Sequence, residues 1–125
     1  HFAVYNGEAG VLRFLLEAGA DPNATDSRQL TLLDMACAGE DATKNVTMVR
    51  ELLKAGADPT RANGIGCIAL HSAAKRGFVK VIDLLLKHSP KSVNCYGNDN
   101  TFTPLCAAAL EGHGGAARRL LDAGA

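Results

Sequence analysis

The sequence predicts an all-α solenoid, in which antiparallel helix pairs stack on one another and a turn or β-hairpin projects between successive pairs. Two observations predict it. The segment EAGADPNATD at 17–26 returns in large part as KAGADPTRAN at 54–63, and its beginning returns as DAGA at 122–125. The paired leucines described below recur once in each of these units. Self-similarity at this period is typical of stacked repeats, because one unit cannot bury its hydrophobic face alone.

The first helix of each pair follows a projecting turn. The segments TLLDMACA at 31–38 and TPLCAAAL at 103–110 each begin with a threonine, which can cap a helix. Pro104 then occupies the first helical position, where its missing N–H is tolerated. Small residues recur at one offset of this helix, as a close approach between neighbouring helices requires: Ala3, Ala36, Ala73 and Ala108.

The second helix of each pair carries two consecutive leucines at one offset. These pairs are Leu15/Leu16, Leu52/Leu53, Leu85/Leu86 and Leu120/Leu121. In three units a glycine soon follows, which suits the left-handed residue that ends a helix. Pro22 and Pro59 prevent the first two of these helices from continuing.

We divide the chain into one domain of four repeats, at 1–25, 26–62, 63–97 and 98–125, and expect it to be a fragment of a longer protein. The second repeat has four extra residues between its helices, within 39–47. They form either a tolerated surface loop or a loop that contacts a partner. The segment 89–100 has two extra residues, which predict a longer or distorted projection between the third and fourth repeats.

The segments TPLCAAALEGH at 103–113, ALHSAAKRGF at 69–78 and LLEAGADPNA at 15–24 closely resemble the ankyrin repeat. The resemblance covers essentially the whole chain. It implies an elongated, slightly curved stack whose β-hairpin or turn fingers project at a right angle. In that family a threonine and a histidine of the T-P-L-H motif bond neighbouring units. The histidine offset here reads His1, Asp34, His71 and Cys106, so we expect a thinner network.

Composition excludes several classes of function. Thirteen basic and thirteen acidic residues give a formal net charge of zero, which disfavours nucleic acid as a partner. No apolar run approaches the roughly 18 residues of a membrane span. The spacing of the four cysteines suits no zinc or redox motif, so we expect no metal and no cofactor. Reduced cysteines favour an intracellular location, in the cytoplasm or the nucleus.

One column of reactive side chains could suggest catalysis, namely Asp34, His71 and Cys106 at the same offset of successive repeats. Packed helices lie about 8 to 10 Å apart, whereas a nucleophile and its base need roughly 2.6 to 3.2 Å. The resemblance also assigns this offset to structural bonds. We therefore expect no enzyme activity and no small-molecule substrate.

The resemblance implies that a partner protein contacts the finger tips and the exposed ends of the first helices. Apolar and aromatic residues at such exposed positions mark interfaces. The alternative is that the fingers fold these side chains back onto the stack. The predicted partner-binding residues are Tyr5, Asn6, Ser27, Arg28, Leu30, Ile65, Lys75, Arg76, Asp99, Asn100, Phe102, Leu110 and Glu111.

The chain is thus predicted to be a monomeric, non-enzymatic module that binds a protein through its concave surface. An alternative is the targeting or regulatory arm of a larger enzyme, such as a kinase, methyltransferase or ubiquitin ligase. A third is a short inhibitor similar to the ankyrin proteins that block cyclin-dependent kinases. The resemblance also implies possible hydroxylation of two finger asparagines, each with a leucine eight residues earlier: Asn23 and Asn94.

Overall fold

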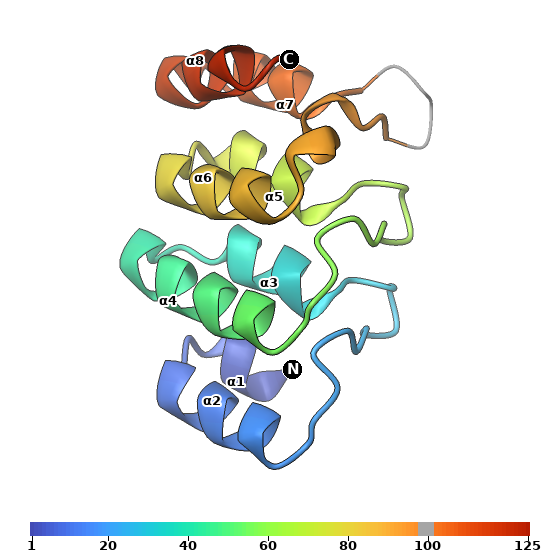
Figure 1. The fold of residues 1–125 in the computed structure, drawn as a ribbon, viewed down its shortest axis with the longest axis vertical. Coiled ribbons are helices and arrows are strands. Elements are labelled where there is room, and N and C mark those ends of the chain that lie inside the picture. The colour runs from blue at the N-terminus through green and yellow to red at the C-terminus, as the bar shows by residue number, and fades with distance from the viewer. Residues whose placement is uncertain (98–101) are drawn as a thin grey trace.

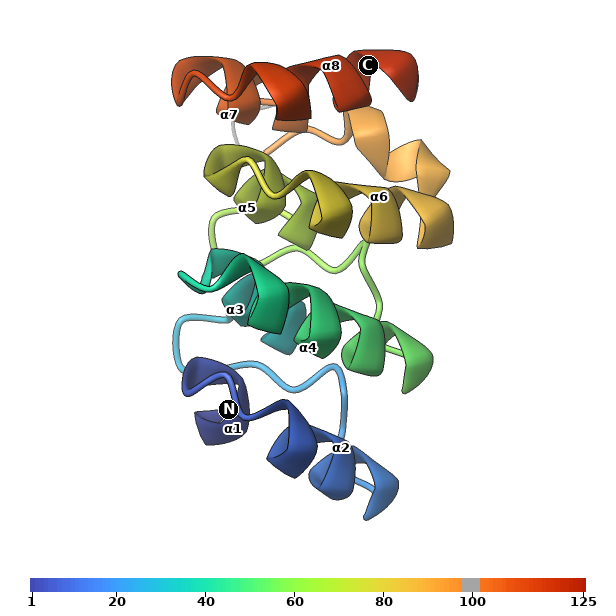
Figure 2. The ribbon, with the colours of Figure 1, turned by 90° about the vertical axis from the view of Figure 1, so that its left-hand side faces the viewer.

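The helices of the protein lie in pairs that stack in chain order along one axis, as the ribbon shows (Figure 1). The computed structural model describes residues 1–97 and 102–125. When the stack is turned by 90°, α4, α6 and α8 lie in front of α3, α5 and α7 (Figure 2). The predicted all-α solenoid is confirmed. The pairs are α1 (Phe2–Tyr5) with α2 (Ala9–Glu17), α3 (Leu32–Ala38) with α4 (Ala42–Lys54), α5 (Ala69–Arg76) with α6 (Val79–His88), and α7 (Pro104–Leu110) with α8 (Gly114–Asp122).

The core runs continuously along the stack, and its inner part consists of alanines. Ala36, Ala73 and Ala108 are each 0% exposed, which confirms that their offset is where helices approach closely. The first leucine of the pair is buried in the second, third and fourth repeats, as Leu52, Leu85 and Leu120, whereas Leu15 of the first repeat is 41% exposed. The stack therefore joins its repeats by side-chain packing that each repeat shares with its neighbours.

Local signals in the sequence set the helix ends. The hydroxyl of Thr31 accepts a hydrogen bond from the Asp34 backbone N–H, and the Asp34 carboxylate accepts one from the Thr31 N–H, which together form a capping box. Thr103 caps α7 through the Cys106 N–H at 3.3 Å. Gly56 ends α4 with a φ of 95°, in the left-handed region that favours glycine.

The sequence predicted a loop for the four extra residues of the second repeat. In the structure they extend α4 instead. This helix has 13 residues, whereas α2 and α8 have 9 each. Its first turn forms because the Asp41 carboxylate accepts hydrogen bonds from the N–H groups of Thr43 and Lys44. Asn45 Nδ2 donates to the Gly39 carbonyl oxygen at 2.8 Å and ties the added turn to the end of α3.

The fingers are short turns that side chains hold in shape. Asp26 Oδ1 accepts from the N–H groups of Arg28 and Leu30 at 2.8 and 2.9 Å, and a single antiparallel bridge joins Thr25 to Thr31. In the next finger, Asn63 Oδ1 accepts in the same way from the N–H groups of Ile65 and Cys67, both at 3.1 Å. The third finger begins with a 3₁₀ helix, η1 (Pro90–Asn94), in place of the GAD turn of the other repeats. The described part of this finger therefore differs from the other two.

Candidate functional site

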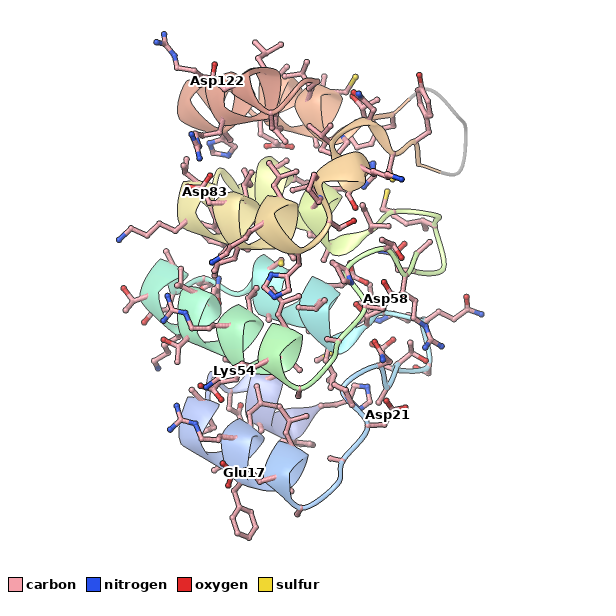
Figure 3. The ribbon with its side chains drawn as sticks, in the orientation of Figure 1. Glu17, Asp21, Lys54, Asp58, Asp83 and Asp122 are labelled. Carbon is pink, nitrogen blue, oxygen red and sulfur yellow. The ribbon has the colours of Figure 1, made fainter. Side chains whose placement is uncertain are left out.

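The fingers project to one side of the stack, beside the ends of α1, α3, α5 and α7, and we call this side the finger face. Side chains that Figure 3 labels on it are Asp21 and Asp58, whereas Asp83 lies on the opposite side, on α6. Each repeat contributes the same positions to this face, so the face is a continuous surface several repeats long. Such a surface suits an extended or folded segment of another macromolecule.

Most of the predicted partner-binding residues that the structure describes are exposed to solvent. Three large apolar side chains are prominent among them: Tyr5 is 81% exposed, Ile65 67% and Leu110 76%. Leu30 and Phe102 are only half-buried, as the alternative of folded-back fingers describes. Asp99 and Asn100 lie outside the described residues. The exposed polar members are Asn6, Ser27, Arg28, Lys75, Arg76 and Glu111.

Phe102 is held against the stack by the third repeat. Its ring stacks on the imidazole of His71, with a centroid distance of 6.1 Å and an interplanar angle of 17°. Because His71 Nδ1 accepts from the Ile68 N–H, Nε2 carries the proton and donates to the Phe102 carbonyl oxygen at 3.1 Å. Burial lowers the pKa of His71, which keeps the ring neutral.

A cavity of about 610 Å³ opens on the finger face between the first and second repeats. Four predicted partner-binding residues line it, namely Tyr5, Asn6, Arg28 and Leu30. We call it the inter-repeat cavity. The sequence analysis did not identify its other lining residues, several of which belong to α3 and to the added turn of α4. Those that matter below are Asp34, Met35, Glu40, Asp41, Lys44 and Met48.

Asp34 occupies the offset of His71 but bonds differently. Its Oδ2 accepts from the backbone N–H and the hydroxyl of Thr31, both at 3.0 Å. Within residues 1–97 and 102–125, Oδ1 has no hydrogen-bond partner, although the side chain is buried. Burial raises the pKa of the Asp34 carboxyl, and the two bonds from Thr31 oppose that rise. The sequence indicated this difference, because Asp34 occupies an offset at which the third repeat has a histidine.

The side chains of the column Asp34, His71 and Cys106 form hydrogen bonds at the N-termini of α3, α5 and α7. Each side chain is bonded three residues back, to Thr31, to the Ile68 N–H and to the Thr103 hydroxyl, respectively. The Thr103 hydroxyl donates to Cys106 Sγ and lowers the pKa of that thiol. The arrangement caps three helices and does not bring the three groups together as a catalytic set.

The two asparagines considered for hydroxylation link successive repeats. Asn23 Oδ1 accepts from the Asp58 N–H at 2.7 Å, and its Nδ2 donates to the Gly56 carbonyl oxygen at 3.4 Å. Asn94 Nδ2 donates to the Gly124 carbonyl oxygen at 3.2 Å. Both amides therefore bond the loop that follows the second helix of the next repeat.

A second cavity, of about 470 Å³, lies between the second and third repeats. Val46, Phe78 and Val79 form its apolar part, and Arg50 and Lys80 lie at its edge. The added turn of α4 thus contributes to both cavities, through different sides of the helix.

Searches for other chemistry give negative findings. No helix in the described part of the chain is long and apolar enough to cross a bilayer. No group of three His, Cys, Asp or Glu residues among those described is placed to hold a metal ion. All four cysteines belong to the described residues and none of them forms a disulfide. Cys37 is fully buried in the core, and that burial raises the pKa of its thiol.

Comparison with known proteins matches the chain to two family models. The model described as "Ankyrin repeats (3 copies)" matches residues 33–125, and the one described as "Ankyrin repeats (many copies)" matches residues 1–36. Together they account for every repeat in the stack.

Similar curated proteins carry very different names. Ankyrin repeat protein nuc-2 of Neurospora crassa is 31% identical over 96% of this chain and 11% of its own length. The NAD-dependent deacetylase sir2B of Dictyostelium discoideum is 34% identical over 66% of this chain and 10% of its own. The human transient receptor potential cation channel subfamily A member 1 is 29% identical over 100% of this chain and 11% of its own. The chain spans about a tenth of the length of these relatives.

Proposed function

The chain belongs to the ankyrin repeat family, and from that premise we propose that it binds a partner protein through the finger face and catalyses no reaction. The observation that supports the proposal is the exposure of three large apolar side chains at predicted finger and helix-end positions, namely Tyr5, Ile65 and Leu110. Desolvation of a few such anchors supplies most of the binding free energy at protein interfaces. The inter-repeat cavity beside Tyr5 adds a concave site of the kind that a partner's side chain fills.

The other features of the chain support a protein rather than another class of partner. Its formal net charge of zero offers no field that would gather a nucleic acid. The cysteines, which form no disulfide, favour the cytoplasm or the nucleus as its location. We expect the domain to be a monomer in the absence of its partner, which sedimentation velocity would measure.

The experiment compares the wild type with a Tyr5→Ser, Ile65→Ser double variant. Tyr5 and Ile65 are preferred to Leu30 and Phe102, because substitution of a half-buried residue would also disturb the stack. The matched control is Phe14→Ser, which removes a 69% exposed aromatic ring from α2, outside the finger face. Circular dichroism first establishes that all three proteins are equally helical.

Tagged proteins are then used to isolate binding proteins from an extract of the source organism. The best candidate is purified, and its affinity for each variant is measured by calorimetry. We expect at least a tenfold loss of affinity in the double variant and none in Phe14→Ser, since two anchors contribute more than about 1.4 kcal/mol together. Equal affinities for all three proteins would contradict binding through the finger face.

A second proposal is that this domain targets or regulates a larger enzyme. It is supported by the relative named as an NAD-dependent deacetylase, of which the matching segment is 10% of the length. In that case the binding surface is unchanged, and catalysis belongs to another domain. Sequencing of the full transcript in the source organism separates the two proposals, because an open reading frame without a catalytic domain would contradict this one.

A further inference from the structure

Among the buried side chains of the described part of the stack, the Asp34 carboxylate is the one with an oxygen that has no hydrogen-bond partner. Asp34 is 2% exposed, its Oδ2 receives both bonds from Thr31, and Oδ1 receives none. A buried, ionised oxygen without a donor is costly, and native structures retain such groups for a reason. The equivalent residue of the third repeat, His71, is also buried, but both of its ring nitrogens form hydrogen bonds.

Within residues 1–97 and 102–125, no cation forms an ion pair with this carboxylate. The charged group that acts on Asp34 is Asp26, a second carboxylate, which raises the pKa of Asp34 further. Arg28 lines the same cavity, but its guanidinium is directed to Asp26, with Nη2 3.4 Å from Oδ2. Lys44 lies at the other edge, where its side-chain carbons lie against Gly7. Arg76 is a third nearby cation, since its Nη2 donates to the Gly39 carbonyl oxygen of the cavity lining at 3.4 Å. The carboxylates of Asp26, Glu40 and Asp41 balance the cations Arg28, Lys44 and Arg76, so Asp34 leaves one negative charge in excess.

The walls of the inter-repeat cavity suit a long cationic side chain. Its volume of about 610 Å³ exceeds that of a single side chain. Met35 and Met48 offer flexible apolar surface, which would contact a methylene stem. The exposed ring of Tyr5 lies at the opening, where an aromatic face attracts a cation. Glu40 and Asp41 add two carboxylates to the lining.

We propose that the inter-repeat cavity receives one lysine or arginine side chain of the partner protein, whose cationic group pairs with Asp34 Oδ1. This inference rests on the proposed function and specifies the chemistry of the partner. Pairing would supply the donor that Oδ1 lacks and would replace an isolated buried charge by a hydrogen-bonded ion pair. The added turn of α4, which brings Glu40, Asp41 and Lys44 to this place, makes the site specific to the second repeat.

The test uses small probes, so it does not depend on finding the partner. N-acetyl-arginine amide and N-acetyl-lysine amide are titrated into the ¹⁵N-labelled domain, with N-acetyl-glutamine amide as the neutral probe of similar length. We expect the cationic probes to shift the amide signals of the cavity residues saturably. Their affinity should fall on the order of tenfold in Asp34→Asn, as expected for loss of a hydrogen bond to a charged group.

The matched control is Asp83→Asn, which removes a carboxylate from the opposite side of the stack (Figure 3). It should leave the probe affinities unchanged. Equal binding of the glutamine probe, shifts that map outside the cavity, or undiminished binding to Asp34→Asn would each overturn the inference.

A measurement on the wild type covers the case in which Asp34→Asn fails to fold. The ¹³C carboxyl signal of Asp34 reports its titration, and a paired cation stabilises the ionised form. The arginine probe should therefore lower the midpoint pH of that signal, and the glutamine probe should not. An unchanged midpoint at saturating arginine probe would overturn the inference.

The outcomes also separate this inference from the proposed function. A partner that binds through Tyr5 and Ile65, while no cationic probe binds the cavity, overturns the inference and supports the function. Probe binding that depends on Asp34, while no purified protein binds the finger face, supports the cation site and contradicts the function.

Discussion

The imidazole Nε2 of His71 lies 3.1 Å from the carbonyl oxygen of Phe102, so a side chain of the third repeat is bonded to the backbone that enters the fourth. The same imidazole accepts from the Ile68 N–H through Nδ1 at 3.2 Å. The neutral imidazole thus caps the first turn of α5 and also bonds the third repeat to the fourth. Repeat 2 has no equivalent bond from Asp34, because a carboxylate cannot donate a proton as a neutral imidazole does.

Replacement of His71 by alanine should destabilise the domain by about 1–3 kcal/mol, since it leaves the Ile68 N–H and the Phe102 carbonyl without their buried partner. Urea unfolding followed by circular dichroism measures the change. His88→Ala is the control, because His88 is exposed and bonds only within its own helix turn, to Leu84. If both variants unfold at the same urea concentration as the wild type, the bridge contributes nothing to the stack.

The same histidine should make stability depend on pH below neutrality. Burial lowers the pKa of His71 in the folded chain below the ordinary 6.5. At pH values between the folded pKa and 6.5, the unfolded chain therefore binds a proton that the folded chain does not. Stability therefore falls as pH decreases through 6.5 toward the folded value. The difference in unfolding free energy between wild type and His71→Gln isolates this contribution. That difference should shrink on acidification, and a constant difference would refute the assignment.

Asp34 should have the opposite dependence. Its folded pKa is raised above the ordinary 3.8, so the folded chain holds a proton that the unfolded chain has already lost. Stability due to this group is greatest below 3.8 and falls as pH rises to the folded value. Asp34→Asn should therefore gain stability relative to the wild type across that window. Thermal unfolding of both proteins at several pH values provides the measurement, and parallel curves would exclude a buried carboxylate at this position.

Replacement of Ala73 by leucine should overpack the inner helices. Ala73 is 0% exposed on α5, which lies between α3 and α7. Extra methylenes in such a contact cost about 1–3 kcal/mol. Ala109→Leu on the exposed side of α7 is the control. A melting temperature that Ala73→Leu leaves unchanged would mean that the inner face has room for a larger side chain.

A pair of glycines separates backbone strain from packing in the turns within repeats. Gly77 and Gly112 have nearly the same φ, 71° and 73°, so an alanine at either should cost about 1–2 kcal/mol. At Gly77 the added Cβ would also lie 2.6 Å from His113 Nδ1, whereas at Gly112 it meets nothing within 4 Å. Gly77→Ala should thus be the more destabilising of the two in chemical unfolding. Equal losses would show that His113 moves aside freely.

The repeat pattern predicted the parts of the fold that depend on neighbours at a fixed offset. Thr31 and Thr103 cap their helices, and Ala36, Ala73 and Ala108 lie at the inner contact, because each depends on a position that every repeat reproduces. The added turn of α4 was expected as a loop. Its composition is polar, and it is helical because Asp41 caps it and Asn45 bonds it to the Gly39 carbonyl at the end of α3.

The candidate site was predicted less completely than the fold. Tyr5, Ile65 and Leu110 are exposed, and their role as anchors for a partner stays a prediction. Phe102 occupies an equivalent finger position but stacks on His71 instead. Nothing in its own segment indicates this, because the stacking partner lies 31 residues earlier and depends on how two repeats meet.

The sequence by itself determined the solenoid, its helix pairs and the side on which a partner is expected, because a repeated chain buries the same offsets in every unit. Only the tertiary structure decided the inter-repeat cavity, the incomplete hydrogen bonding of Asp34 and the bridge from His71 to Phe102. Each of these arises where one repeat meets the next. The same offset holds a carboxylate in one repeat and an imidazole in another, and its role depends on which groups the neighbouring repeat presents to it.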